Sequence, residues 1–197
     1  MKEFTIPKVL LASGSPRRRQ LLADAGYDVV TVTSREVEES YPFTLDAENV
    51  AEYLSKLKFD AYADMAGKDG RILLTADTVV VVDGKVLGKP ADAREAKKML
   101  RSLSGRTHHV ITGVTLGDGV STRSFSVTTQ VHFDTLSDAQ IDYYIAIYKP
   151  FDKAGAYGIQ EWIGLVGIKG IDGCFYNVMG LPVNAIDRAI AEIRKSI

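Results

Sequence analysis

The run Ile72 to Val82, with the sequence ILLTADTVVVV, constrains the fold of this chain more than any other segment. It is rich in valine, a β-branched residue that packs well in strands. Asp83-Gly84 follows directly and has the composition of a two-residue hairpin turn. The run therefore predicts the strongest strand of the chain, closed into a hairpin at its end.

Asp77 is the charged residue inside this apolar run. A carboxylate buried there without partners would cost several kcal/mol or would be forced into its neutral form. Asp77 is therefore expected at a strand end or an opening, where a metal ion, a cation or a water molecule meets it. The alternative is a structural aspartate that accepts hydrogen bonds from backbone N–H groups and from Thr78.

Helical and strand-like patterns alternate along the rest of the chain. Strands are expected at 9–12, 27–33, 110–116, 124–133, 165–169 and 174–178, with the last two as a hairpin around Asp172-Gly173. Helices are expected after Ser15, from about 46, over 92–103, from Ser137 to about 148, and from 183. The hairpins predict an α/β fold with a mixed, partly antiparallel sheet flanked by helices. Because no linker or repeat divides the chain, residues 1–197 are expected to form a single domain.

Composition narrows the class of partner. The chain has 197 residues and a formal net charge of −1, so no global positive field attracts nucleic acid or an anionic membrane. The single cysteine, Cys174, excludes an internal disulfide framework. The N-terminal apolar run is too short for a signal peptide, and no segment approaches the length of a membrane-spanning helix. A cytoplasmic protein that binds neither nucleic acid nor membrane is expected.

The stretch SGSPRRRQLL, residues 13–22, concentrates positive charge at the start of a predicted helix. Ser15 is a typical N-cap, and the backbone N–H groups of a first turn favour an anion. Ser13 and Ser15 in the turn, with the guanidinium groups of Arg17 and Arg18, are therefore candidates for binding a phosphate. The alternative is a solvated basic helix face on which Arg19 and its neighbours are merely exposed.

Further candidates are scattered along the chain. Glu38 and Glu39 offer oxygen ligands for magnesium or manganese, although acidic loops are usually only solvated. Lys58, Lys89 and Lys153 are cations whose meaning depends on whether the fold brings them together. The amide of Gln160, in a glycine-rich loop, is able to read a base edge through one donor and one acceptor. A catalytic role for the pair His108-His109 is not expected, since at most one of them faces a given side of a strand.

Five blocks of the sequence resemble the Maf family of nucleoside triphosphate pyrophosphatases. They are LLASGSPRRRQLL, LTADTVVVVDGKVLGKP, MLRSLSGRTHHVITGV, FDKAGAYGIQ and NVMGLPV, and they run in the family's order from about residue 9 to 183. The resemblance implies an α/β fold shared with inosine triphosphate pyrophosphatases and hydrolysis of a nucleoside triphosphate to the monophosphate and pyrophosphate. It also implies a divalent metal cation, Mg²⁺ or Mn²⁺, and a possible homodimer.

Carried onto this chain, the resemblance gives residues their roles. The family's first-helix arginine corresponds to Arg17, its proton-accepting aspartate to Asp77 and its acidic residue to Glu38, so that Glu38 and Asp77 are the expected metal ligands. The family's two lysines correspond to Lys58 and Lys89, although YLSKLKFDA departs from the usual pattern around Lys58. The resemblance does not separate two roles for Asp77, proton acceptor or metal ligand.

Within the family, ADT followed by AYGIQ resembles the branch that acts on dTTP and UTP. Arg17, Thr78 and Gln160 are then the expected specificity positions. Two alternatives stay open: the sister branch that acts on 7-methyl-GTP, and a nucleotide-binding regulator of septum formation without turnover. Glu161-Trp162 replaces the glycine that commonly follows GIQ, and a carboxylate beside the base pocket could alter which base is accepted.

Overall fold

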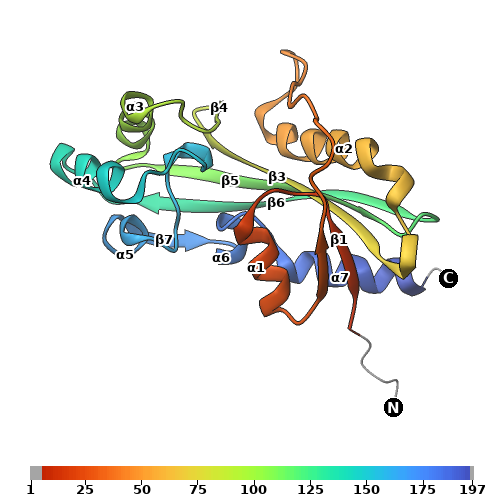
Figure 1. Cartoon of the computed structure of the whole chain (residues 1–197). Coiled ribbons are helices and arrows are strands. Elements are labelled where there is room, and N and C mark those ends of the chain that lie inside the picture. The colour runs from red at the N-terminus through yellow and green to blue at the C-terminus, as the bar shows by residue number, and fades with distance from the viewer. Residues whose placement is uncertain (1–5, 196–197) are drawn as a thin grey trace.

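The sheet has the mixed architecture that the sequence predicts. The computed structural model describes residues 6–195 and shows an α/β fold with a seven-stranded sheet in the order β2-β1-β3-β5-β6-β7, with β4 beside β3 (Figure 1). β1 is parallel to β2 and β3, and the other pairs are antiparallel. The strands are β1 (Lys8–Leu11), β2 (Asp28–Thr31), β3 (Ile72–Val82), β4 (Lys85–Leu87), β5 (Thr107–Gly117), β6 (Thr122–Phe133) and β7 (Ile168–Asp172).

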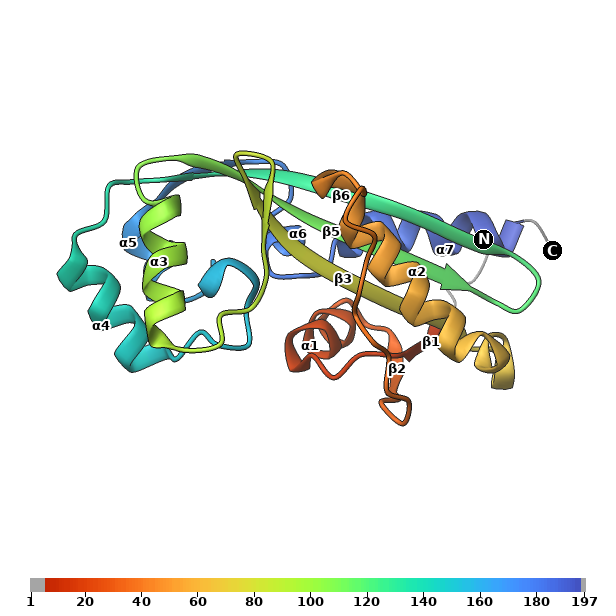
Figure 2. The same cartoon turned by 90° about the horizontal axis from the view of Figure 1, so that it is seen from above.

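Helices cover both faces of the sheet and one end of its long strands (Figures 1 and 2). α2 lies across one face, α1 and α7 lie on the opposite face, and α3, α4 and α5 gather at the end of the sheet away from α7. The helices are α1 (Pro16–Asp24), α2 (Val50–Tyr62), α3 (Ala93–Leu103), α4 (Asp138–Tyr148), α5 (Trp162–Gly167), α6 (Phe175–Val178) and α7 (Val183–Lys195). Short 3₁₀ turns occur at Ala47–Asn49, Ala63–Met65, Lys68–Gly70 and Ala154–Ala156. Within residues 6–195, none of the helices combines the length and the apolar character needed to cross a bilayer.

Side chains of β3 alternate between two hydrophobic cores. Leu74 and Ala76 pack with α1 and α7, whereas Leu73 and Val79 pack with residues of α2. Successive strand residues point to opposite faces, so Asp77 shares the α2 face of the sheet. The strand predicted from the valine run is thus buried on both sides, and its carboxylate points toward a helix.

The β3 edge that faces β1 and β4 is only partly paired. β1 pairs with Ile72–Leu74 and β4 pairs with Val80–Val82, and no strand within residues 6–195 pairs with residues 75–79 between them on this edge. The opening lies beyond the carboxyl end of β1, the position at which α/β sheets commonly bind ligands. Asp77 lies in this gap, which agrees with its expected place at an opening.

The start of α1 forms as predicted. Ser15 is the N-cap, its Oγ accepts the Arg18 backbone N–H at 3.5 Å, and Pro16 occupies the first helical position. The N-terminus of α1 therefore follows β1 directly and faces the open edge of β3. After the helix, Gly26 adopts a φ of 83°, a left-handed conformation that glycine tolerates without strain.

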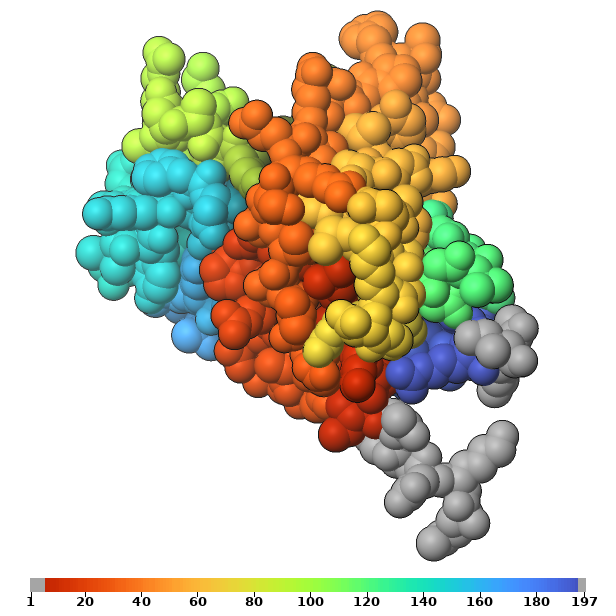
Figure 3. Space-filling view, turned by 45° about the vertical axis from the view of Figure 1, so that its right-hand side comes forward, coloured from red at the N-terminus to blue at the C-terminus, as the bar shows by residue number. Residues whose placement is uncertain are grey.

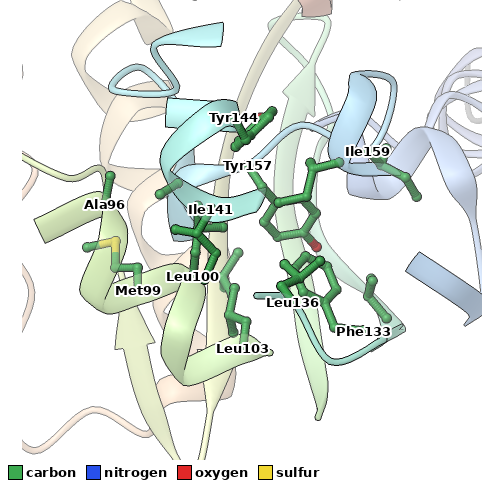
Figure 4. Packing of buried hydrophobic residues seen from close by; sticks show 14 of the residues in the cluster. Ala96, Met99, Leu100, Leu103, Phe133, Leu136, Ile141, Tyr144, Tyr157 and Ile159 are labelled. Carbon is green, nitrogen blue, oxygen red and sulfur yellow. The ribbon is translucent and has the colours of Figure 1, made fainter. Parts of the chain in front are cut away.

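A separate hydrophobic cluster fills the far end of the long strands (Figure 4). Four residues on one face of α3, Ala96, Met99, Leu100 and Leu103, are all buried in it. The predicted start of α4 at Ser137 is also confirmed, and a capping box forms there through reciprocal hydrogen bonds between Ser137 and Gln140. Both helices therefore begin and pack as their sequence patterns indicate.

The predicted hairpin of 165–169 and 174–178 is wrong. Only Ile168–Asp172 is a strand, which pairs with β6, while most of the first segment lies in α5 and the second forms α6. The helical turn of α6 is held by the buried Asn177, whose Nδ2 donates to Val110 O and to Thr129 Oγ1, both at 3.0 Å. Short apolar runs do not distinguish a strand from a helix by themselves, and here tertiary hydrogen bonds decide.

Candidate functional site

A cavity of about 500 Å³ opens at the unpaired edge of β3. Figure 3 shows the surface where its segments meet: cyan to light-blue residues around the loop before α5, yellow-green residues near β4, and orange residues after β2. The predicted site residues that line it are Ser13, Ser15, Arg17, Arg18, Lys58, Asp77, Thr78, Lys89 and Gln160. Five separate parts of the chain thus converge at one place, whereas Glu38 is exposed and is not among the lining residues.

A chain of charges crosses the cavity from β3 to the loop after β2. Lys58 Nζ lies 2.5 Å from Asp77 Oδ1 and 2.8 Å from Glu39 Oε1. The side chains of Lys58 and Asp77 are only 15% and 12% exposed, whereas that of Glu39 is 49% exposed. The aspartate in the valine run is thus partnered by a cation from α2, which is one of the arrangements expected for it.

Glu39 is the residue of the acidic loop that lines the cavity, whereas its neighbour Glu38 does not. Burial by itself raises the pKa of the Glu39 carboxyl, but the hydrogen bond from Lys58 and the charges of Lys58, Lys89 and Arg18 outweigh it. The pKa of Glu39 therefore lies below its ordinary value, and the group is ionised at neutral pH.

Arg18 is a partly buried arginine that links the start of α1 to β3. Its guanidinium donates to Ala76 O at 2.8 Å, Thr78 Oγ1 at 3.0 Å and Gly180 O at 2.9 Å. Burial lowers the pKa of Arg18, opposed first by the charge of Asp77. Because a carbonyl at the unpaired edge of β3 would otherwise lack a donor, Arg18 completes the hydrogen bonding of the strand.

Arg17 is freer than Arg18. Its Nη1 lies 2.6 Å from Asp152 Oδ2, across the mouth of the cavity, and its side chain is 27% exposed. Lys153 Nζ contacts the other oxygen of Asp152 at 2.7 Å. Burial would raise the pKa of Asp152, but hydrogen bonds from Lys153 and Arg17 hold it at about 2. The Asp152 carboxylate is thus paired with Arg17 and Lys153, two cations that could otherwise bind a phosphate.

The remaining predicted residues complete the walls. Lys89 is exposed in the loop after β4, and Gln160 is exposed in the loop before α5. Thr78 Oγ1 lies 3.0 Å from Thr112 Oγ1 and also accepts from Arg18. The cavity is therefore cationic on the α1 and Lys89 sides, and the side chains of Thr78 and Gln160 add neutral hydrogen-bonding groups to its wall.

Three residues considered from sequence lie away from the cavity wall. The Glu161 carboxylate contacts Lys153 and Tyr144, and Trp162 packs edge to face on Tyr143. His108 is fully buried, bonds Tyr157 through Nε2 at 2.7 Å, and burial lowers its pKa to about 3. His108 is therefore a neutral imidazole that solvent and ligands do not reach.

The donor atoms suit a hard divalent cation. Glu39 and Asp77 both contact the Lys58 ammonium, so their oxygens converge on a point where positive charge is stabilised. Among residues 6–195, no group of three or more His, Cys, Asp or Glu side chains is arranged to hold a metal ion. Magnesium commonly binds through one or two carboxylates together with substrate phosphates, so this pair fits a metal that arrives with its substrate.

Some lining residues carried little signal in the sequence. Asp152 is 135 positions from Arg17, and only the fold reveals their pairing. Arg35 lines the cavity and pairs with Asp64 at 2.6 Å. No motif surrounds Arg35, whereas Asp152 lies inside the block FDKAGAYGIQ, in which the sequence singled out Lys153 and Gln160 but not this aspartate.

The fold and the cavity together define an α/β protein with a cation-rich pocket built around a buried carboxylate–lysine pair. Such a pocket suits a ligand that is rich in phosphate. The chain belongs to the Maf-like protein family, whose sequence pattern matches residues 8–193. The predicted resemblance is thereby confirmed over nearly the whole chain.

Relatives of similar length carry one common name. A protein of Bacteroides thetaiotaomicron, named dTTP/UTP pyrophosphatase, is 50% identical over 91% of this chain and 92% of its own length. One of Phocaeicola vulgatus with the same name is 50% identical over 95% of both chains. A third, of Cytophaga hutchinsonii, is 53% identical over 90% of this chain and 80% of its own length, and is also named dTTP/UTP pyrophosphatase.

Proposed function

We propose that this chain is a nucleoside triphosphate pyrophosphatase that hydrolyses dTTP and UTP to the monophosphate and pyrophosphate. The geometry that carries the proposal is the Asp77–Lys58–Glu39 chain of charges, facing the N-terminus of α1 across one cavity. The family membership and the names of relatives at half identity support the same activity. A hydrolase acting on a phosphoanhydride bond needs this combination of cations and a carboxylate.

The triphosphate would bind along the cationic side of the cavity. The N–H groups of the first turn of α1, capped by Ser15, favour an anion, and Ser13 adds a hydroxyl beside them. Arg17 would exchange Asp152 for a phosphate oxygen, while Lys89 would neutralise charge from the loop after β4. Arg18 is held by backbone carbonyls, so its contribution would be to fix the α1 turn and Thr78.

Water would attack the α-phosphorus. A bond forms between the water oxygen and this phosphorus, the bond to the bridging oxygen breaks, and pyrophosphate leaves with the electron pair. Asp77 would accept the water's proton, and Lys58 would hold the carboxylate in place. No covalent intermediate with the protein is needed.

Glu39 and Asp77 would hold a divalent cation, Mg²⁺ or Mn²⁺. When bound, the ion supplies neutralisation of the charge that develops on the phosphate oxygens. Glu39 takes the place that the family pattern gave to Glu38, because Glu39 is the carboxylate that reaches Lys58. Asp77 would then serve as both ligand and proton acceptor, or as one of the two.

Gln160 and Thr78 would contact the base. Both line the cavity, and an amide that offers a donor and an acceptor matches the edge of a pyrimidine. Arg17, at the mouth, would bind phosphate and so influence preference only indirectly.

The test is a panel of triphosphates, including dTTP, UTP, GTP and 7-methyl-GTP, each with Mg²⁺, Mn²⁺ and Co²⁺. We expect pyrimidine triphosphates to be preferred and Asp77→Asn to lower turnover roughly a hundredfold or more, the usual scale for general-base catalysis. Preference for 7-methyl-GTP would support the sister branch. Binding without turnover would support a nucleotide-binding regulator of septum formation. Unchanged turnover in Asp77→Asn would contradict the role of Asp77.

We retain three predictions of the sequence as proposals: residues 1–197 act as one domain, the protein works in the cytoplasm, and it forms a homodimer. Size-exclusion chromatography with light scattering measures the oligomeric state, and limited proteolysis measures whether one protected unit spans the chain. A monomer at micromolar concentration would contradict the dimer.

A further inference from the structure

The carboxylate of Glu161, which is not among the residues that line the cavity, contacts α4. Its Oε1 lies 3.1 Å from Lys153 Nζ, and its Oε2 accepts a hydrogen bond from the Tyr144 hydroxyl. The side chains of Lys153 and Glu161 are only 10% and 17% exposed. Glu161 therefore sits in an enclosed ion pair directly after Gln160, where the family commonly has glycine.

Tyr144 is the centre of this arrangement. Its hydroxyl donates to Glu161 and accepts the backbone N–H of Gly158 at 3.0 Å. The ring is fully buried in the same cluster as Tyr157 and Ile159 (Figure 4). Burial, the hydrogen bond to Glu161 and its charge all raise the pKa of the Tyr144 hydroxyl, which stays a hydrogen-bond donor at neutral pH.

The loop between α4 and α5 is thus held on both sides of its cavity-lining part. The Tyr144 hydroxyl bonds both Gly158, which precedes Gln160, and Glu161, which follows it. Glu161 also pairs with Lys153 near the start of the loop. The backbone between these points is sharply bent, because Ala156 has a φ of 62°, an unfavourable conformation for a residue with a side chain. A loop bent in this way needs tertiary contacts to keep one conformation.

We propose that Glu161 and Tyr144 are positioning residues that fix the Gln160 amide against the cavity and so set the preference for the base. The proposal rests on the proposed contact between Gln160 and the base. A donor–acceptor amide discriminates between bases only when it is held to within a fraction of an ångström. Within residues 6–195, neither Lys58 on α2 nor Asp77 on β3 contacts Glu161 or Tyr144. Changes at Glu161 or Tyr144 should therefore leave the chemical step, which we assign to Lys58 and Asp77, unaffected.

The experiment compares Tyr144→Phe, Glu161→Gln and the double variant with wild type. Asp142→Asn is the matched control, because Asp142 lies on α4 but forms an exposed pair with Lys97. Dissociation constants for dTTP and dGTP are measured by calorimetry in excess chelator, so that the metal proposed to support turnover is absent, and kcat and KM are measured for both nucleotides with Mg²⁺. Urea unfolding gives the stability of each variant.

We expect Tyr144→Phe to lower the preference for dTTP over dGTP about tenfold, the scale of one hydrogen bond to a charged group. KM for dTTP should rise while kcat stays within about twofold, since binding and not chemistry is affected. Glu161→Gln should have a smaller effect because an amide oxygen still accepts from Tyr144. In the double variant, the loss of base preference, expressed as a free energy, should be smaller than the sum of the losses in the two single variants, because both changes act on one network. Asp142→Asn should match wild type.

An unchanged preference in Tyr144→Phe, whatever its stability, would overturn the proposal. So would a loss confined to kcat, which would assign the network to chemistry. Binding preference is read without turnover, so the inference is tested even if the wild-type protein hydrolyses neither nucleotide. Absence of turnover in the wild-type protein would refute the proposed function alone. Normal turnover with an unchanged preference in the variants would refute only the role of Glu161 and Tyr144.

Discussion

Replacing Lys58 by methionine removes an ammonium while keeping an unbranched side chain of similar length. Lys58 and Asp77 are 15% and 12% exposed, and removing one partner of a buried ion pair costs about 3–5 kcal/mol. Asp77 lines the cavity and can take up water, so we expect the lower end of that range. The pair with the half-exposed Glu39 adds at most about 1 kcal/mol. We therefore expect Lys58→Met to lose about 3 kcal/mol of unfolding free energy at pH 7.5.

The pH dependence of this loss follows from Glu39. Its pKa in the folded protein is depressed, chiefly by Lys58 acting against burial. A depressed carboxyl pKa contributes stability that is present above the unfolded value of about 4.3 and is lost as the pH falls through the folded value. In Lys58→Met the hydrogen bond and the charge of Lys58 are absent, and the effect of burial on the pKa of Glu39 is opposed only by the charges of Lys89 and Arg18. The difference between wild type and variant should thus be widest near neutrality and should narrow below about pH 4.

The assay is urea unfolding followed by fluorescence of Trp162, the single tryptophan, at pH 3.5 and pH 7.5. Lys97→Met is the control, because Lys97 pairs with the exposed Asp142 and should change stability by less than about 1 kcal/mol. Mg²⁺ should stabilise Lys58→Met more than wild type, since the ion can take the place of the ammonium between the carboxylates. Equal stabilities at pH 7.5, or a difference that does not narrow in acid, would refute this reasoning.

Three further predictions follow from the same contacts. Arg17→Ala should change the melting temperature little, because its pair with Asp152 is partly exposed, while kcat/KM for dTTP falls about ten- to hundredfold, as steady-state kinetics will measure. Arg18→Met should lower unfolding free energy by about 2 kcal/mol or more, since it strips donors from buried carbonyls; an unchanged urea midpoint would contradict this. Gly113→Ala should lower the unfolding free energy by more than about 2 kcal/mol, because the new Cβ would lie 2.2 Å from the backbone of α2. Thermal melts measure the effect, and Gly170→Ala, whose new Cβ has its nearest contact at 3.8 Å, is the control.

The parts of the fold that were predictable from sequence are those governed by local chemistry. The valine run forms β3 over the predicted residues, and Asp83-Gly84 turns with φ values of 51° and 69°, as a two-residue hairpin requires. Ser15 caps α1 and Ser137 caps α4 because side-chain oxygens satisfy the free N–H groups of the first turn. Neighbours in the sequence determine each of these features.

The errors arose where distant residues decide the local structure. The segment 174–178 is helical because Asn177 bonds β5 and β6, and its own apolar pattern fits a strand equally well. The metal-ligand role expected for Glu38 stays a prediction, but the structure shows that Glu39 is the carboxylate that reaches Lys58, and the spacing of an acidic loop does not contain that information.

The candidate site shows the same division. The cations of the first turn of α1 and the buried Asp77 were recognisable because each breaks the expected pattern for its position. Their convergence depends on the gap in the β3 edge, which follows from where β1 ends and β4 begins. The Arg17–Asp152 pair, which spans 135 positions, becomes visible only in the folded chain.

Hydrolysis of dTTP in ¹⁸O-labelled water, with Mg²⁺ and mass analysis of both products, tests the central claim most directly. If water attacks the α-phosphorus beside Asp77, the label appears in dTMP, the second product is unlabelled pyrophosphate, and Asp77→Asn forms both roughly a hundredfold more slowly. Label in pyrophosphate, release of orthophosphate with dTDP, or an Asp77→Asn rate equal to that of wild type would contradict the account.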